Sequence, residues 1–100
     1  MKIDNKNINT IKRLSKKYKV KTLSAFGSIV KGDLNSESDI DFVVDFEEDD
    51  PFKYTDLYFE FKDKLETLLK RKIDLIELRG IKNQFFRKEL KETQVPIYGQ

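Results

Sequence analysis

The chain has 100 residues, which predicts one domain over residues 1–100 because two hydrophobic cores would not fit in this length. Its 20 Lys and Arg against 18 Asp and Glu give a formal net charge of +2, and it contains neither Cys nor His. This composition excludes disulfide frameworks, zinc sites of the usual ligand set and nucleophiles activated by histidine, and it leaves carboxylate, hydroxyl, amine and backbone chemistry.

Charge is strongly segregated along the chain. Residues 1–32 carry nine Lys or Arg and one Asp, residues 33–52 carry nine Asp or Glu and no base, and residues 53–100 carry eleven bases and eight acids. No apolar run approaches the roughly 18 residues of a membrane span, and the first residues lack the apolar stretch of a signal peptide. We therefore expect a soluble, cytoplasmic protein with no membrane partner.

The first third of the chain predicts a helix, a strand and a short helical turn. Residues 5–18 place apolar side chains at helical spacing, with Lys and Arg on the other side. Residues 20–26 are β-prone and are followed by Gly27, so they predict a strand. One or two helical turns follow and end at Gly32, and residues 33–38 have the composition of a turn.

Residues 39–46 predict a second strand, and the region after it predicts a long helix. The apolar residues of this strand fall on one face at period two, namely Ile40, Phe42, Val44 and Phe46. Residues 47–51 predict an acidic loop in which Asp50 caps a helix that has Pro51 in its first turn. The expected buried stripe of that helix consists of Tyr54, Leu57, Tyr58, Phe61, Leu65, Leu68 and Leu69.

The last third predicts a strand, a helix and a short edge strand. Residues 73–78 are apolar and β-branched, and we expect this strand to run up to Gly80. Residues 81–91 predict a helix, and residues 95–98 predict a strand that Pro96 confines to a sheet edge. The apolar side of that last helix would consist of Ile81, Phe85, Phe86 and Leu90. The alternation of helices and strands indicates an α/β (α+β) fold, with helices over a small sheet of three to four strands.

Asp39 and Asp41 are the first candidates for chemistry. They stand two residues apart on a predicted strand, so their carboxylates leave the same face with Cβ atoms roughly 7 Å apart. Like charges at this spacing favour a bound cation, and oxygen ligands of this kind favour Mg²⁺. The alternative is a solvated strand face beside the acidic loop.

Gly27-Ser28 and Asp74 add to this pair. A glycine between a strand and a helix lets the backbone approach a ligand, and N–H groups at a helix start attract phosphate oxygens, although Gly-Ser alone also fits a plain tight turn. Asp74 lies in an otherwise apolar strand, where a buried acid needs a partner. It would complete a carboxylate triad for two metal ions; alternatively it is an exposed edge residue or pairs with Arg71 or Lys72.

Together these residues resemble the signature of the minimal nucleotidyltransferases, small members of the DNA polymerase beta superfamily. Gly27-Ser28 is followed after ten residues by Asp39-Ile40-Asp41, with Gly32 and Ser38 between them. Asp74 resembles the third catalytic Asp of the family, and Lys31 stands where the family commonly has Arg. The similarity covers almost the whole chain and implies a polymerase beta-like fold with a small mixed sheet.

The resemblance also implies a reaction, the transfer of AMP from ATP to a hydroxyl with release of pyrophosphate. By the family's pattern, the residues that bind the nucleotide and its phosphates are Gly27, Ser28, Lys31 and Ser38. Two Mg²⁺ ions would be bound by Asp39, Asp41 and Asp74, and Asp74 would also activate the acceptor. Proteins of this length resemble prokaryotic antitoxins that adenylylate a tyrosine of a HEPN-type ribonuclease toxin encoded nearby, which implies a hetero-oligomer with that toxin.

Three alternatives stand beside this hypothesis. One is an antitoxin that neutralises its toxin by binding alone, and another is a nucleotidyltransferase that acts on RNA or on a small molecule. The third is nucleic-acid binding through the first helix and the residues after it, whose bases are Lys12, Arg13, Lys16, Lys17, Lys19 and Lys21. A lysine-rich face without an aromatic stacking platform is usually solvated, so we do not expect a nucleic-acid partner.

Overall fold

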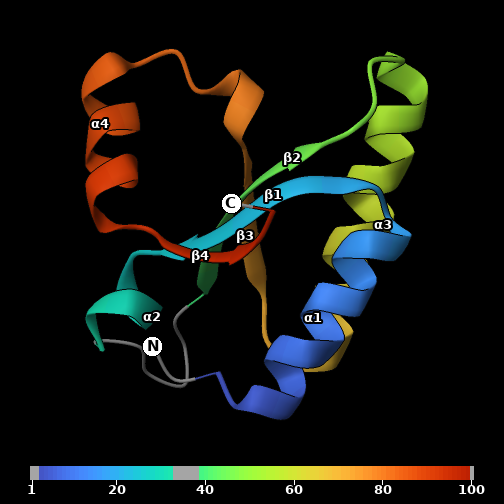
Figure 1. Ribbon diagram of the computed structural model, residues 1–100, viewed down its shortest axis with the longest axis horizontal. Coiled ribbons are helices and arrows are strands. Elements are labelled where there is room, and N and C mark those ends of the chain that lie inside the picture. Colours follow the sequence, from blue (N-terminus) through green and yellow to red (C-terminus); the bar gives the residue numbers. More distant parts are fainter. Residues whose placement is uncertain (1–2, 33–38, 100) are drawn as a thin grey trace.

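A mixed β-sheet runs through the middle of the protein, with helices on both of its faces (Figure 1). The computed structural model describes residues 3–32 and 39–99. The strands in these ranges are β1 (Val20–Phe26), β2 (Ile40–Phe46), β3 (Ile73–Glu77) and β4 (Val95–Tyr98). The helices are α1 (Asn5–Lys17), α2 (Ser28–Lys31), α3 (Pro51–Leu69) and α4 (Gln84–Thr93), with a 3₁₀ turn, η1, at Leu78–Gly80. The expected order of helices and strands is confirmed, and so is the α/β class.

The strands are arranged in the order β3-β2-β1-β4. β1 is antiparallel to both β2 and β4, whereas β2 and β3 are parallel and are joined by the crossover helix α3. Phe26 pairs with Asp41 across β1 and β2, and Asp41 pairs with Asp74 across β2 and β3. The end of β1 and the beginnings of β2 and β3 therefore lie in one row across the sheet.

One face of the sheet, called the core face here, is covered by α1 and α3 (Figure 1, right). The predicted apolar face of β2 lies here, because Phe42 and Phe46 are fully buried and Phe46 packs edge-on against Tyr54 and Phe61 of α3. The main core cluster consists of Ile11, Tyr18, Val20, Leu23, Ala25, Ile29, Ile40, Phe42, Val44, Phe46, Tyr54, Phe61, Leu65, Ile73, Leu75 and Ile97. Burial of this apolar surface is what holds the sheet and the two long helices together.

The opposite face, called the second face, carries the odd-numbered residues of β2 and lies next to α4 (Figure 1, left). Phe86 of α4 packs edge-on against Phe26 of β1, with 6.2 Å between ring centroids. Val43 and Leu90 are also buried, outside the core-face cluster. Residues paired directly across a sheet send their side chains to the same face. Phe26 pairs with Asp41, and Asp41 pairs with Asp74, so both aspartates lie on the second face together with Phe26.

Two predicted boundaries near the C-terminal end were wrong. The third strand ends at Glu77 rather than running up to Gly80, because Arg79 holds the chain in η1 by donating to the carbonyls of Phe46 and Glu48. The last helix begins at Gln84 rather than at residue 81. The side chain of Asn83 caps it there by accepting hydrogen bonds from the backbone N–H groups of Phe85 and Phe86.

Phe85 was also wrongly placed on the buried side of this helix, since 86% of it is exposed. The cap sets the rotation of α4 so that Phe86 and Leu90, four residues apart, turn to the sheet. The capping predictions at Asp50 and Gly32 are confirmed, and the predicted turn at residues 33–38 lies outside the described residues. Within the ranges that the structure describes, no helix combines the length and the apolar character needed to cross a membrane.

Candidate active site

Gly27 lies against the side chain of Asp41. Gly27 follows the last residue of β1 and starts α2 with a φ of +72° and a ψ of −142°, a conformation in which side chains are strained. A Cβ atom built on Gly27 would lie 2.5 Å from the Oδ2 atom of Asp41. Only glycine therefore lets this carboxylate lie against the strand-to-helix turn, and the predicted approach of this backbone to a ligand stays a prediction.

Asp74 lies beside Asp41, because the two are direct partners in the parallel register of β2 and β3. Neighbouring strands are about 4.8 Å apart, and paired residues send their side chains to the same face. Asp74 is exposed, and β3 is the outer strand of the sheet. The exposed edge position that the sequence left open is therefore found, so Asp74 needs no buried partner, and its role in a carboxylate triad stays a prediction.

The three predicted carboxylates act on one another electrostatically. Partial burial raises the pKa of Asp41 above its usual value, and the nearby charges of Asp74 and then Asp39 raise this pKa further. Asp39 is exposed and directly precedes the first residue of β2. A positive ion at this position would relieve the repulsion among the three groups.

No three acidic side chains in the described ranges already converge on a point where a metal ion would sit. This arrangement still fits Mg²⁺, which is usually held by one or two carboxylates together with water and substrate phosphates rather than by a complete protein cage. Asp41 and Asp74 supply oxygen donors of the required chemistry on one face. A bound Mg²⁺ is accordingly a proposal, taken up below.

The predicted phosphate-binding residues are only partly described. Ser28 is the first residue of α2 and is partly buried, next to the turn that contacts Asp41. Lys31 is the last residue of α2 and is exposed. Ser38 lies outside the described residues. The structure thus brings Gly27, which starts α2, to the carboxylate of Asp41, and Ser28 and Lys31 are the first and last residues of that short helix.

Two residues that hold β2 and β3 in place were not found from the sequence. The hydroxyl of Tyr58 on α3 donates a hydrogen bond of 2.6 Å to the carbonyl oxygen of Leu75, the residue after Asp74. Burial raises the pKa of Tyr58, and the charges of Glu77 and Asp74 add to this effect. Arg79 forms an ion pair with Asp45 and also donates a hydrogen bond to the carbonyl of Phe46 at the end of β2. The helical stripe indicated Tyr58 as a core residue only, and no pattern pointed to Arg79.

Comparison with known proteins agrees with this geometry. The family described as polymerase beta, nucleotidyltransferase matches residues 9–100. A Methanocaldococcus jannaschii protein that carries the name of a protein adenylyltransferase is 40% identical over 86 residues, which cover 86% of this chain and 85% of that protein. A toxin–antitoxin crystal structure with AMP-PNP has a TM-score of 0.73 at 25% identity, over 94% of this chain and 74% of that one.

A second solved structure has the same fold. It is a tri-AMPylated Shewanella oneidensis HEPN toxin in complex with an MNT antitoxin, with a TM-score of 0.67 at 22% identity over 98% of this chain and 74% of that one. The family match over nearly all residues and the 40% identity to the archaeal relative agree with the motif and with the carboxylates on the second face. This chain belongs to the polymerase beta nucleotidyltransferase family.

Proposed function

We propose that this chain transfers AMP from ATP to a hydroxyl group of a partner protein. The observation that carries the proposal is the row of Gly27, Asp41 and Asp74, in which two carboxylates on parallel strands meet the turn that starts α2. The name of the archaeal relative and the AMP-PNP in the toxin–antitoxin structure support protein adenylylation with ATP as the donor.

In the proposed reaction, the oxygen of the acceptor hydroxyl attacks the α-phosphorus of ATP. A new bond forms between that oxygen and the α-phosphorus, while the bond from the α-phosphorus to the oxygen that bridges to the β-phosphorus breaks. Pyrophosphate leaves with the bridging oxygen, and the hydroxyl proton passes to the carboxylate of Asp74, which is exposed on the outer strand. Positioning and charge neutralisation carry most of such a reaction.

Asp39, Asp41 and Asp74 would hold two Mg²⁺ ions together with water and the phosphate oxygens of ATP. When bound, these ions neutralise the charge on the leaving pyrophosphate and make the acceptor hydroxyl easier to deprotonate. Gly27, Ser28 and Lys31 would bind the triphosphate on the side of α2, and Ser38 is proposed for the same role. The closeness of Gly27 to the side chain of Asp41 supports this assignment.

The acceptor that we propose is a tyrosine of a HEPN-type ribonuclease toxin, so that this chain acts as an antitoxin in a hetero-oligomer. The Shewanella oneidensis structure joins an AMPylated HEPN toxin to an MNT antitoxin of the same fold as this chain. The structure with AMP-PNP is also a toxin–antitoxin pair. Both support a toxin as the partner.

The test uses the HEPN-type toxin that we propose as the acceptor. The purified toxin is incubated with this chain, ATP and Mg²⁺, and its intact mass and its peptides are measured by mass spectrometry. We expect one or more AMP groups on a tyrosine. The Asp41→Asn variant should add none, whereas Asp63→Asn, a matched change at an exposed acid on α3, should add AMP as the original chain does.

Two results would contradict the proposal. A toxin whose mass does not change with the original chain would exclude it as the acceptor. Full protection of cells by Asp41→Asn without any AMP on the toxin would instead establish neutralisation by binding alone.

A further inference from the structure

Asp74 has fewer neighbours to hold it than Asp41 has. Asp41 lies on β2, between β1 and β3, and its side chain lies against Gly27. Asp74 is exposed and lies on β3, which has a neighbouring strand on one side only within the described residues. An exposed side chain makes few contacts, so its position depends on how firmly its backbone is held. The support of β3 around Asp74 therefore bears on the geometry of the site.

The backbone of β3 turns its polar groups alternately to β2 and to the outer edge of the sheet. Lys72 accepts a hydrogen bond of 3.1 Å from the N–H of Ile40, so its groups and those of Asp74, two residues later, point to β2. The groups of Ile73 and Leu75 consequently point away from β2, to the outer edge. Backbone groups at a free edge have no partner in a neighbouring strand.

Two side chains of α3 bind these outer groups on either side of Asp74. The carboxylate of Glu66 accepts a hydrogen bond of 3.1 Å from the N–H of Ile73, the residue before Asp74. The hydroxyl of Tyr58 donates its bond of 2.6 Å to the carbonyl oxygen of Leu75, the residue after Asp74. Both bonds are partly buried, so water competes with them less than it does at the surface. Asp74 therefore lies between two bonds to a single long helix.

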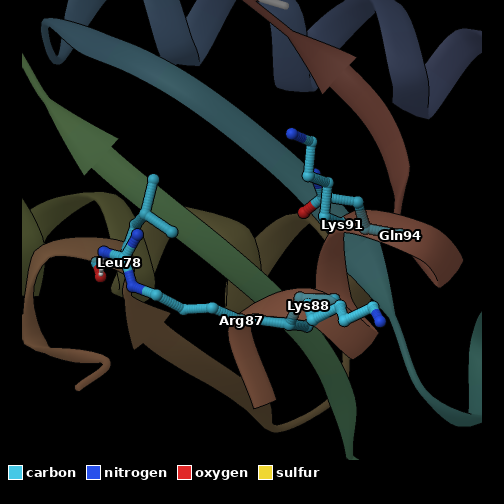
Figure 2. A pocket seen from close by; sticks show the side chains of 6 residues that line it. Leu78, Arg87, Lys88, Lys91 and Gln94 are labelled. Atoms are coloured by element: carbon cyan, nitrogen blue, oxygen red, sulfur yellow. Dashed lines mark hydrogen bonds between the residues drawn. The ribbon is translucent and has the colours of Figure 1, made fainter. Parts of the chain in front are cut away.

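The far end of β3 is held by other groups. Arg87 of α4 reaches toward Leu78, as Figure 2 shows, and its Nη2 atom donates to the carbonyl oxygen of Leu78 at 2.9 Å. Its Nε atom donates to the carbonyl oxygen of Ile81 at 2.8 Å. Leu78 lies four residues beyond Asp74, a span of about 13 Å along a strand. These bonds fix the end of β3 and leave the support of its beginning to α3.

We propose that Tyr58 and Glu66 are positioning residues, which hold the Asp74 carboxylate at the separation from its neighbour on β2 that the reaction needs. The role of Asp74 in that reaction rests on the proposed function, whereas the holding of β3 rests on the two hydrogen bonds. Catalytic groups need to be fixed to within about 0.5 Å, and a displacement of about 1 Å can slow a reaction about a hundredfold.

The first test measures AMP transfer to the toxin by purified variants, with kcat and the KM for ATP determined separately. Tyr58→Phe and Glu66→Met should each lower kcat about tenfold, because each loses one of the two bonds. The KM for ATP should stay within about twofold, because the triphosphate is assigned to α2 rather than to β3. Glu66→Gln keeps an oxygen that can accept from Ile73, so it should retain most of the original kcat.

Tyr54→Phe is the matched control, because it removes a hydroxyl from the same helix one turn earlier. The Tyr54 hydroxyl is buried without a hydrogen-bond partner among the described residues. Its removal should leave kcat within about twofold. Circular dichroism checks that each variant is folded at the temperature of the assay.

The second test needs neither ATP nor metal nor toxin, so its outcome does not depend on the proposed function. Backbone amide relaxation measured by NMR gives order parameters, which are about 0.85 for rigid backbone and below about 0.6 for flexible backbone. In the original chain, Asp74 should lie near the rigid value. The variant that combines Tyr58→Phe with Glu66→Met should lower the value at Asp74 toward the flexible range. Leu23, in the middle of β1, is the internal control and should keep its value.

Unchanged kcat in both Tyr58→Phe and Glu66→Met would overturn the proposal, and so would an equal loss in Tyr54→Phe. An order parameter at Asp74 that stays at the rigid value in the double variant would overturn it too. If the original chain transfers no AMP, the proposed function fails, and the order parameters alone decide whether α3 fixes Asp74.

Discussion

Asp41 on β2 and Asp74 on β3 are direct partners in the parallel strand register, so two carboxylates leave the same face of the sheet side by side. Adjacent acids of this kind weaken the folded protein unless a cation lies between or beside them. The raised pKa of Asp41 reflects this cost, with burial as its largest cause. We therefore expect these carboxylates to lower the stability of the free protein and to bind positive charge together with the substrate.

Asp41→Asn should raise the melting temperature of the metal-free protein at about pH 7.5, by a few degrees. The folded-state pKa of Asp41 lies above its ordinary 3.8, so the stability contributed by its protonated form is present below 3.8 and is lost as pH rises through the folded value. The difference in melting temperature between the variant and the original chain should therefore shrink toward zero at about pH 3. Thermal unfolding followed by circular dichroism, with EDTA present, measures it.

The control for this prediction is Asp63→Asn, which changes an exposed acid on α3 that carries no assigned role. It should leave the melting temperature nearly unchanged at both pH values. An Asp41→Asn variant that melts below the original chain at neutral pH would contradict the electrostatic account.

Gly27→Ala should reduce AMP transfer about a hundredfold, because its Cβ would displace the Asp41 carboxylate. It should also destabilise the fold by about 1 to 3 kcal/mol through backbone strain. Gly32→Ala is the matched control, since Gly32 has a φ of +81° but no atom of the described residues lies within 4 Å of a built Cβ. That control should cost about 1 to 2 kcal/mol and keep most of the transfer rate. Equal transfer rates in the two variants would show that the contact with Asp41 has no role.

Arg79→Lys should destabilise the protein by about 1 to 2 kcal/mol in urea unfolding. The guanidinium bonds at once to Asp45, Phe46 and Glu48 and lies 4.2 Å over the ring of Tyr54, whereas an ammonium cannot make the planar contacts. Arg13→Lys on α1 is the control, because Arg13 is exposed and donates a hydrogen bond to the side chain of Thr10. A loss of the same size in both variants would argue against a special role for Arg79 at the end of β2.

Mg²⁺ together with a non-hydrolysable ATP analogue should raise the melting temperature of the original chain. At a ligand concentration ten times the dissociation constant, the stabilisation is about 1.4 kcal/mol. Asp41→Asn combined with Asp74→Asn should lose most of this stabilisation, and EDTA should remove it from the original chain. Full stabilisation of that double variant would place the metal–nucleotide complex elsewhere.

Local sequence patterns predicted most helices and strands of this fold correctly, and each error has a cause in particular residues. Alternation in residues 40–46 and the cap at Asp50 depend on neighbours in sequence, so both were predicted correctly. The end of β3 depends on Arg79 reaching across to β2, and the burial of Phe86 rather than Phe85 depends on a cap that sets helix rotation. Neither long-range bonds nor helix phase can be derived from composition.

The candidate site, too, was predicted from local sequence patterns only in part. The spacing of Asp39 and Asp41 indicated a shared strand face, but the position of Asp74 beside them depends on strand order and register, which a single sequence does not determine. Asp74 was a candidate because it is an acid in an apolar strand, and the resemblance to a known family implied its role in the site.

The most direct test of the central claim is a double-mutant cycle on the rate of AMP transfer to the toxin, with Asp41→Asn, Asp74→Asn and both together. Because the two carboxylates are proposed to act as one unit, each single change should slow transfer at least about a hundredfold, and the double variant should be little slower than either. A single variant that retains nearly the original rate would contradict the account, and so would losses that simply multiply.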